Sequence, residues 1–276
     1  HVIRGDDHLN NTPRQINMLT ALGAKPPIYA HVPMILGADG ARLSKRHGAV
    51  SVMQYREEGY LPEALLNYLI RLGWSHGDQE IFSRAEMIAL FDTADVNNAA
   101  AAVNPDKLLW LNQHYIKDGD PARLATQLRY FMERRGVNLA DGPPLDKLVL
   151  AQRERAKTLV EMADNSLFFY REFDAYDPKA AAKSLKPEIA SALRALREAL
   201  SGLTTWTAAA VHAALESVAQ AQGLNLGKLA QPLRVAVTGS GVSPPIDITV
   251  ELIGKARSLA RLERALSYIE EPPALA

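Results

Sequence analysis

The sequence contains no cysteine among its 276 residues. Disulfide bonds and thiolate metal sites are therefore excluded, and the composition fits a reducing compartment. The chain also lacks an uninterrupted apolar stretch long enough to cross a bilayer, and it shows no signal-peptide pattern. We therefore expect a soluble, cytoplasmic protein without a membrane partner.

The sequence also has no net charge. It carries 31 Lys and Arg against 31 Asp and Glu, for a formal net charge of +0. A neutral chain has no general attraction to nucleic acid or to an anionic membrane, so any polyanion site has to be a local cluster. Hydrophobic residues make up 47% of the chain, enough for a packed interior. The length predicts two or more compact units.

The first residues have the pattern of a strand, a polar turn and a helix. "HVI" is typical of a strand end, "RGDDHLNN" of a turn, and Asn11 or Thr12 can cap a helix that has Pro13 in its first turn. Ligands collect where the strands of such α/β units end. Further on, "IYAHVPMIL" is a candidate strand, and "LPEALLNYLIRLGW" predicts an amphipathic helix with Pro62 in its first turn and Gly73 at its end.

Beyond about residue 84 nearly all the patterns are helical. Asp120 and Thr207 are predicted to cap two of these helices, and residues 176–188 are expected to be a linker or helix break between two helical sub-bundles. The predicted fold class is mainly α with a small α/β N-terminal portion.

A basic loop stands out at residues 41–48, "ARLSKRHG", after the turn-like "MILGADG". Cations on a flexible loop can hold a phosphate chain and follow the charge that develops as pyrophosphate leaves. The alternative is a solvated surface loop, which the cluster taken alone favours. It is not a Walker loop, because G-x-x-x-x-G-K-[ST] occurs nowhere in the chain.

Five stretches in the same order change that balance: "HVIRGDDHLNNTPRQ", "YAHVPMIL", "RLSKRHGA", "GYLPEALLNYLIRLGWS" and "QPLRVAVTG". Together they resemble bacterial glutamyl-tRNA synthetases over essentially the whole chain. The resemblance implies the end of a class I Rossmann catalytic domain, a stem-contact region and an all-α anticodon-binding domain. The expected boundaries are 1–28, 29–115 and 116–276, the last with sub-bundles at about 116–180 and 181–276.

The resemblance also implies what the basic loop does. It corresponds to the KMSKS signature, in which Lys45 contacts ATP and acts in catalysis together with Arg42 and Ser44. Arg42 stands where the family usually has lysine, and its guanidinium group still suits phosphate. Leu43 belongs to the expected ATP site.

In the "RGDDHLNN" turn, the resemblance assigns Arg4 to the carboxylate of the glutamate substrate. It assigns Asp7 and His8 to the ATP and adenylate pocket. From the residues alone, Asp6, Asp7 and His8 could instead be a metal cluster or a helix cap, with the cap favoured. The other histidines are scattered, so no protein-bound metal is predicted.

Class I synthetases also need an H-x-G-H motif, and none occurs in this sequence. In the family that motif lies upstream of everything present here. We therefore expect the chain to be the C-terminal part of a synthetase that lacks the first half of its catalytic domain. Half an active site should not catalyse.

The stretch "VELIGKARSLARLERALSYI" predicts an amphipathic helix with Arg257, Arg261 and Arg264 along one side. One interpretation is that these arginines contact tRNA phosphates. The other, equally weighted, is an ordinary helix with a solvated outer face.

The resulting hypothesis is a fragment of a glutamate–tRNA ligase that binds tRNA but does not catalyse. The whole enzyme would use ATP with Mg²⁺ to form glutamyl-adenylate and transfer glutamate to tRNA(Glu), and we expect a monomer. An alternative is a non-catalytic tRNA-binding module. An enzyme that glutamylates queuosine on tRNA is disfavoured because it typically lacks the helical half. Glutaminyl-tRNA synthetase is disfavoured because its anticodon region is a β-barrel.

Overall fold

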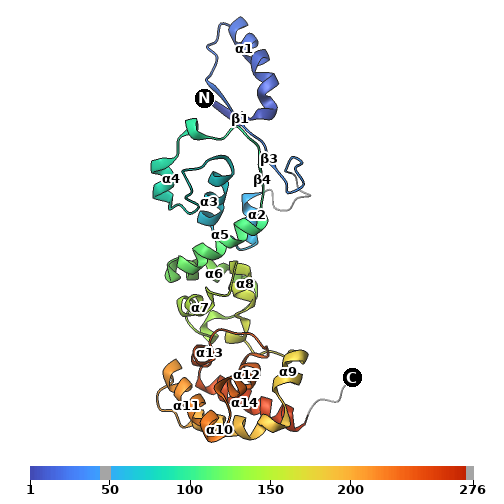
Figure 1. Cartoon of the computed structure of the whole chain (residues 1–276), viewed down its shortest axis with the longest axis vertical. Helices are drawn as coiled ribbons and strands as arrows, with labels where there is room; N and C mark the ends of the chain where they lie inside the picture. The colour runs from blue at the N-terminus through green and yellow to red at the C-terminus, as the bar shows by residue number, and fades with distance from the viewer. Residues whose placement is uncertain (44–50, 272–276) are drawn as a thin grey trace. The chain divides into compact units, whose positions relative to one another are not determined.

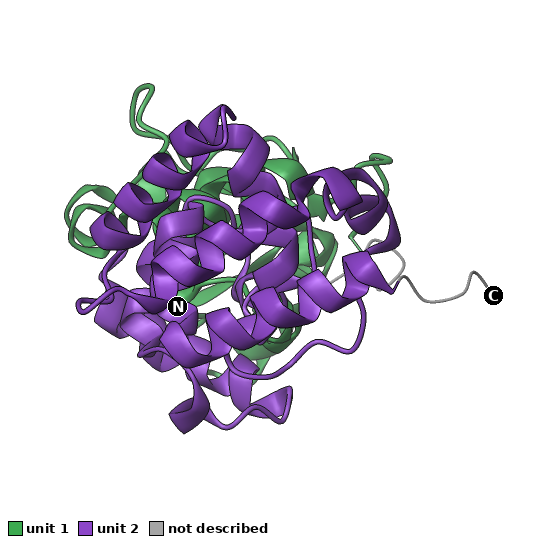
Figure 2. Cartoon of the chain, turned by 90° about the horizontal axis from the view of Figure 1, so that it is seen from below, with its two compact units in different colours: residues 1–118 green, residues 119–276 purple. Residues whose placement is uncertain are grey.

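The structure is a computed structural model that describes residues 1–43 and 51–271. The chain divides into two compact units, residues 1–118 and 119–276, coloured separately in Figure 2. Short strands occur in the first unit, and helices dominate the second (Figure 1). The predicted fold class, mainly α with a small α/β portion at the N-terminus, is confirmed.

The elements of unit 1 are, in chain order, β1 (Val2–Gly5), η1 (Asp6–Asn11), α1 (Thr12–Ala21), β2 (Tyr29–Val32), β3 (Ile35–Leu36), α2 (Val52–Glu57), α3 (Pro62–Gly73), α4 (Arg84–Leu90), η3 (Thr93–Asp95), β4 (Ala101–Ala102) and α5 (Pro105–Asp118).

Two parallel strand pairs organise the start of unit 1. β1 pairs with β2, and β3 pairs with β4. The 3-10 helix η1 runs directly into α1, with Pro13 in the first turn as predicted. The predicted side-chain cap is wrong: Asn11 has helical dihedral angles and makes no capping bond. The amide of Thr12 instead donates to the carbonyl of Leu9 in η1, so the preceding helix supplies an acceptor for α1.

The core of unit 1 lies between α3 and α5, where apolar side chains from both helices are buried. The predicted helix start at Pro62 and end at Gly73 are both confirmed. Asn67 of α3 is fully buried and ties this core to a loop. Its Oδ1 accepts from the Phe82 amide at 2.7 Å and from the Tyr115 hydroxyl at 2.8 Å. The amide group therefore satisfies polar groups that burial would otherwise penalise.

The elements of unit 2 are α6 (Pro121–Arg134), η4 (Leu139–Asp141), α7 (Leu145–Gln152), α8 (Leu159–Asp164), η5 (Leu167–Phe169), α9 (Pro178–Ser184), η6 (Pro187–Ile189), α10 (Ala190–Ser201), α11 (Ala208–Ala221), α12 (Leu226–Thr238), α13 (Ile246–Ile253) and α14 (Lys255–Glu270).

Two groups of helices pack within unit 2. α6 lies against α7 and α8, and its apolar face is buried there, including Leu124 and Leu128. α10 to α14 form the second group. The caps predicted at Asp120 and Thr207 are confirmed, since each side chain accepts a hydrogen bond from an amide in the first turn of its helix. No described helix has the length and apolar character needed to span a membrane.

Two predicted features of unit 2 differ in the structure. Residues 176–188 are not a plain linker, because Asp177 caps α9, which begins at Pro178. The amphipathic stretch near the C-terminus is not one helix. Gly254 interrupts it with φ 87° and ψ 157°, which separates α13 from α14. An unbroken apolar pattern does not show such a break, because the pattern continues across both helices.

Candidate functional site

Arg4 lies on β1 opposite His31 of β2 and reaches across to the first turns of α1. Its Nη2 donates to Thr12 Oγ1 and to Gln15 Oε1, both at 2.8 Å. The guanidinium carbon lies 5.2 Å from the centre of the Tyr29 ring. The side chain is half-buried, and these contacts orient it from the strand and the helix. Both Nη2 hydrogens are used in these contacts, which leaves Nη1 to donate charge-assisted hydrogen bonds to a carboxylate.

The start of the basic loop is held next to the "RGDDHLNN" turn. Arg42 forms an antiparallel bridge with Leu36 of β3, and the Leu43 amide donates to the Ile35 carbonyl at 3.1 Å. Arg42 Nη2 lies 3.4 Å from Asp7 Oδ2. The Arg42 side chain is 70% exposed, so its charge is accessible to a solvent-borne anion. The structure thus brings together two residues predicted at the ATP site from distant parts of the sequence.

His8, Ser44 and Lys45 complete the predicted nucleotide-site residues. The His8 side chain is exposed, and its Nδ1 lies 3.3 Å from Asn11 Nδ2. Ser44 and Lys45 lie outside the described residues. Their assignments stay predictions. Within the described ranges, the structure contains no group of three or more His, Asp or Glu side chains arranged to hold a metal ion.

The arginines of α14 share one side of the helix, but that side faces the protein interior. Arg261 is only 1% exposed. Its Nε donates to Glu172 Oε2 at 2.9 Å, its Nη1 to the Val237 carbonyl at 2.6 Å, and its Nη2 to the Arg171 carbonyl at 3.0 Å. Burial lowers the pKa of Arg261, and the hydrogen bond and charge of Glu172 act against that shift. The prediction that Arg261 belongs to a solvent-facing, phosphate-binding stripe is therefore wrong.

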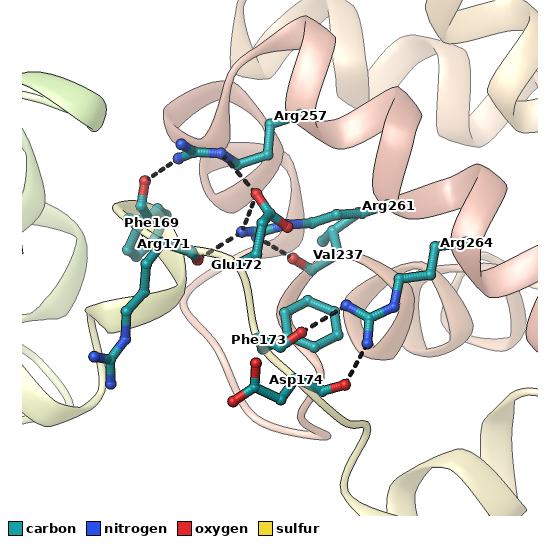
Figure 3. A network of polar contacts seen from close by, with 9 residues as sticks. All are labelled: Phe169, Arg171, Glu172, Phe173, Asp174, Val237, Arg257, Arg261 and Arg264. Carbon is teal, nitrogen blue, oxygen red and sulfur yellow. Dashed lines mark hydrogen bonds and ion pairs between the residues drawn. The ribbon is translucent and has the colours of Figure 1, made fainter.

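The other two arginines also donate inward, to the same chain segment (Figure 3). Arg257 Nη1 donates to the Phe169 carbonyl at 2.6 Å. Arg264 Nη1 and Nη2 donate to the carbonyls of Phe173 and Asp174, each at 2.6 Å. Guanidinium groups used this way are already committed within the protein, because main-chain carbonyls take the donors that phosphate would need. The three arginines do lie on one side of a helix, but that side packs against residues 169–174.

A cavity of about 930 Å³ lies on the surface of unit 2 next to this segment. Its lining comes from residues 152–174 and 238–243 and includes Arg155, Arg171, Phe168 and Phe173. Both arginines are exposed residues. Burial, and secondarily the positive charge of Arg155, lowers the pKa of the neighbouring Arg234. The cavity lining combines the two arginines and the aromatic rings with four carboxylates, Glu161, Asp164, Glu172 and Asp174. Two of these carboxylates pair with arginines outside the lining, Asp164 with Arg135 and Glu172 with Arg257 and Arg261. The rings and the exposed guanidinium planes offer stacking surfaces for a planar ligand.

None of these cavity residues was predicted from the sequence. The signal for them is the basic run "RERAK" at 153–157 together with the interleaved "FFYREF" at 168–173. Arginines next to aromatic rings are typical of sites that bind unpaired nucleotides. Neither stretch is distinctive alone, and folding is needed to place them around one cavity.

Comparison with known proteins gives two family matches in tandem. Residues 1–110 match the family described as tRNA synthetases class I (E and Q), catalytic domain, and residues 123–266 match the anticodon binding domain family. The arginine–aromatic cavity thus falls within the second match.

Close relatives cover nearly the whole chain. Glutamate–tRNA ligase 1 of Alkalilimnicola ehrlichii is 59% identical over 99% of this chain and 58% of its own length. Glutamate–tRNA ligase 1 of Nitrosococcus oceani is 60% identical over 98% of this chain and 58% of its own length. A crystal structure of a glutamate tRNA ligase from Elizabethkingia meningosepticum in complex with its amino acid is 30% identical, with a TM-score of 0.84, over 98% of this chain and 57% of that one. The chain therefore spans somewhat more than half the length of the relatives it matches.

Proposed function

The chain belongs to the glutamate–tRNA ligase family, and from that premise we propose that it is part of an enzyme that activates glutamate with ATP and transfers it to tRNA(Glu). The observation that carries this proposal is the tandem match of a catalytic-domain family and an anticodon-binding family, in that order, along one chain. The identity of 59% to a glutamate–tRNA ligase supports glutamate as the amino acid. Such an enzyme would act as a monomer in the cytoplasm.

In this proposal, unit 1 contributes part of the amino-acid and nucleotide site. Arg4, oriented by Thr12, binds the glutamate carboxylate. Arg42, highly exposed beside Asp7, meets the ATP phosphates. Lys45 stabilises the charge that develops as pyrophosphate leaves. Mg²⁺ enters with ATP as part of the substrate.

Unit 2 contributes the RNA site, at the arginine–aromatic cavity. Unpaired bases can stack on aromatic rings or on guanidinium planes, and arginines can hydrogen-bond their edges or the adjoining phosphates. Arg155 and Arg171 supply the cationic groups, and Phe168 and Phe173 supply rings. The chain as a whole is neutral and the cavity lining also carries four carboxylates, so the attraction has to come from stacking and from the individual arginines.

The chain by itself is proposed to bind tRNA without making glutamyl-adenylate. The H-x-G-H motif is absent from its sequence, and the chain spans 58% of the length of its glutamate–tRNA ligase relatives. Glutamate-dependent exchange of pyrophosphate into ATP by the purified chain, above background, would contradict this part of the proposal.

A salt titration of the affinity for tRNA(Glu) tests the RNA site. Arg155→Gln and Arg171→Gln should each weaken binding and, where a phosphate contact is lost, reduce the slope of log affinity against log salt by about 0.7–0.9. Arg129→Gln is the matched control, because Arg129 is exposed on α6 and pairs with Glu133. The cavity is not the RNA site if both cavity variants bind tRNA like the control.

A further inference from the structure

Three arginines of α14 hold one short segment by its main chain, as Figure 3 shows. We refer to residues 169–174 as the wall segment and to Arg257, Arg261 and Arg264 as the arginine clamp. The clamp donates to carbonyls at positions 169, 171, 173 and 174 of the wall segment. The two parts lie about 90 positions apart in the sequence. The contacts are thus purely tertiary.

The wall segment separates the clamp from the arginine–aromatic cavity. Its residues 171–174 line the cavity, whereas the three clamp arginines are not among the described residues that line it. The clamp therefore acts on the cavity through the backbone of the wall segment and through the Phe173 ring. Arg171 shows this most directly, because its carbonyl accepts from Arg261 while its side chain lines the cavity.

The arginine clamp is also hydrogen-bonded to α12, in addition to its bonds to the wall segment. Arg261 Nη1 donates to the carbonyl of Val237 in α12, at 2.6 Å. Glu172 accepts from Arg261, and its Oε1 also lies 3.1 Å from Arg257 Nε. The Phe173 ring lies 4.8 Å from the Arg264 guanidinium carbon and 5.2 Å from that of Arg261. The guanidinium group of Arg261 thus joins α14, α12 and the wall segment.

We propose that the arginine clamp positions the wall segment so that Arg171 and Phe173 meet unpaired RNA bases in a fixed geometry. The clamp residues are positioning residues and do not contact the RNA. This inference rests on the proposed function, because it takes RNA as the ligand of the cavity. A precise wall matters because discrimination between bases depends on hydrogen-bond geometry, whereas phosphate attraction tolerates displacement.

Arginine can position the wall segment in a way that lysine cannot, because its donors are several and lie in one plane. The planar guanidinium group of Arg261 directs donors to Val237, Arg171 and Glu172 at the same time. A lysine ammonium group keeps the charge but cannot reproduce that planar set of donors. Arg261→Lys therefore separates a positioning role from a charge role.

The experiment compares the affinity of the full 276-residue chain for two hairpin RNAs. One is the anticodon stem–loop of tRNA(Glu), and the other has the same stem with the anticodon bases replaced. Arg261→Lys and Arg261→Met should both reduce the preference for the matched hairpin, by roughly tenfold where one base contact is lost. Neither should change the salt slope, because the Arg261 charge is buried and offset by Glu172. If Arg261→Lys binds like wild type while Arg261→Met loses salt dependence, Arg261 is an RNA contact and the inference is overturned.

Glu172→Gln provides a second variant that leaves the buried arginine in place. The glutamine keeps a carbonyl oxygen that can accept from Arg261, so the buried donors stay satisfied while the negative charge is lost. It removes a negative charge beside the cavity, and a simple charge role would make RNA bind more tightly. Positioning predicts the reverse, a weaker preference for the matched hairpin. Tighter binding with unchanged preference contradicts the clamp.

Hydrogen exchange gives a measurement without RNA. Amides of the wall segment should exchange several-fold faster in Arg261→Lys than in wild type, with α6 unaffected. Unchanged exchange in the wall segment overturns the clamp.

The hairpin experiment distinguishes failure of the RNA site from failure of the clamp. If the wild-type chain prefers neither hairpin, the proposed RNA site fails. If wild type prefers the matched hairpin and the Arg261 variants do so equally, that site stands and the positioning role is wrong.

Discussion

Arg4, the residue proposed to bind the glutamate carboxylate, is held in place by two hydrogen bonds from its side chain to α1. Thr12 and Gln15 each accept from its Nη2 at 2.8 Å. In a full-length ligase that carries this sequence, Arg4→Ala should lower kcat/KM for glutamate by about 10–100-fold, since a hydrogen bond to a charged group contributes about 1.5–3 kcal/mol. Pyrophosphate exchange at varied glutamate measures this. Arg14→Ala, on the exposed side of α1, is the control. An unchanged kcat/KM for glutamate would remove Arg4 from the site.

Tyr115 predicts how the stability of unit 1 depends on alkaline pH. Its hydroxyl oxygen lies 2.8 Å from both Asn67 Oδ1 and the Phe82 carbonyl oxygen, so its single proton has two acceptors within reach. Burial, with smaller contributions from Glu63 and Glu86, raises the pKa of Tyr115 from 10.0 to about 12. Between these values the unfolded chain loses the proton while the folded chain keeps it. The stabilisation is therefore complete below about pH 10 and is lost as pH rises through about 12.

The comparison of wild type with Tyr115→Phe isolates this effect. Wild type should be more stable to urea at neutral pH, because the variant leaves a buried acceptor unpaired. The difference should shrink as pH rises above about 10, since only wild type has the phenol to ionise. A stability difference that stays constant over that interval would contradict the assignment.

Among the elements, the break between α13 and α14 depends on one glycine. Gly254 has φ 87° and ψ 157°, a region essentially reserved for glycine. An added Cβ would meet no atom within 4 Å, so the cost of Gly254→Ala comes from the backbone alone. We expect a loss of about 1–3 kcal/mol in the free energy of unfolding.

Gly202→Ala is the matched control for that substitution. Gly202 ends α10 with φ −75° and ψ −11°, which alanine adopts readily. Its added Cβ would lie 3.5 Å from the Ala199 carbonyl oxygen, an ordinary contact. This variant should be neutral or stabilising by up to about 1 kcal/mol. Urea unfolding of both variants decides the matter, and equal effects would show that the Gly254 conformation is not what matters.

For the molecule as a whole, the two units should differ in independent stability. Unit 2 has two packed helical groups, and its first helix has its own cap at Asp120. Residues 119–276 expressed alone should therefore give native helical circular dichroism and one cooperative urea transition. Residues 1–118 should be less soluble, because Leu22 and Ile28 are 81% and 67% exposed. A non-cooperative transition for residues 119–276 would contradict the prediction.

Local sequence determined where many elements begin and end. Asp120 and Thr207 were predicted as helix caps and Pro62 as a first-turn residue, and each has that position in the structure. A cap is a bond between residues a few positions apart, so it can be predicted without the rest of the fold. The extended resemblance likewise identified the family, because ordered matches along a chain do not depend on knowing contacts. Lys45 and Ser44 remain sequence predictions only.

Tertiary structure alone decided what the arginines do. The sequence placed Arg257, Arg261 and Arg264 on one side of a helix, but helical periodicity does not say whether that side meets solvent or protein. Their partners in the wall segment lie about 90 positions away. The same holds for Arg155 and Arg171, which share a cavity with residues 238–243 only after the two helical groups pack. Periodicity sets which side chains share a face of a helix, whereas long-range packing sets what that face touches.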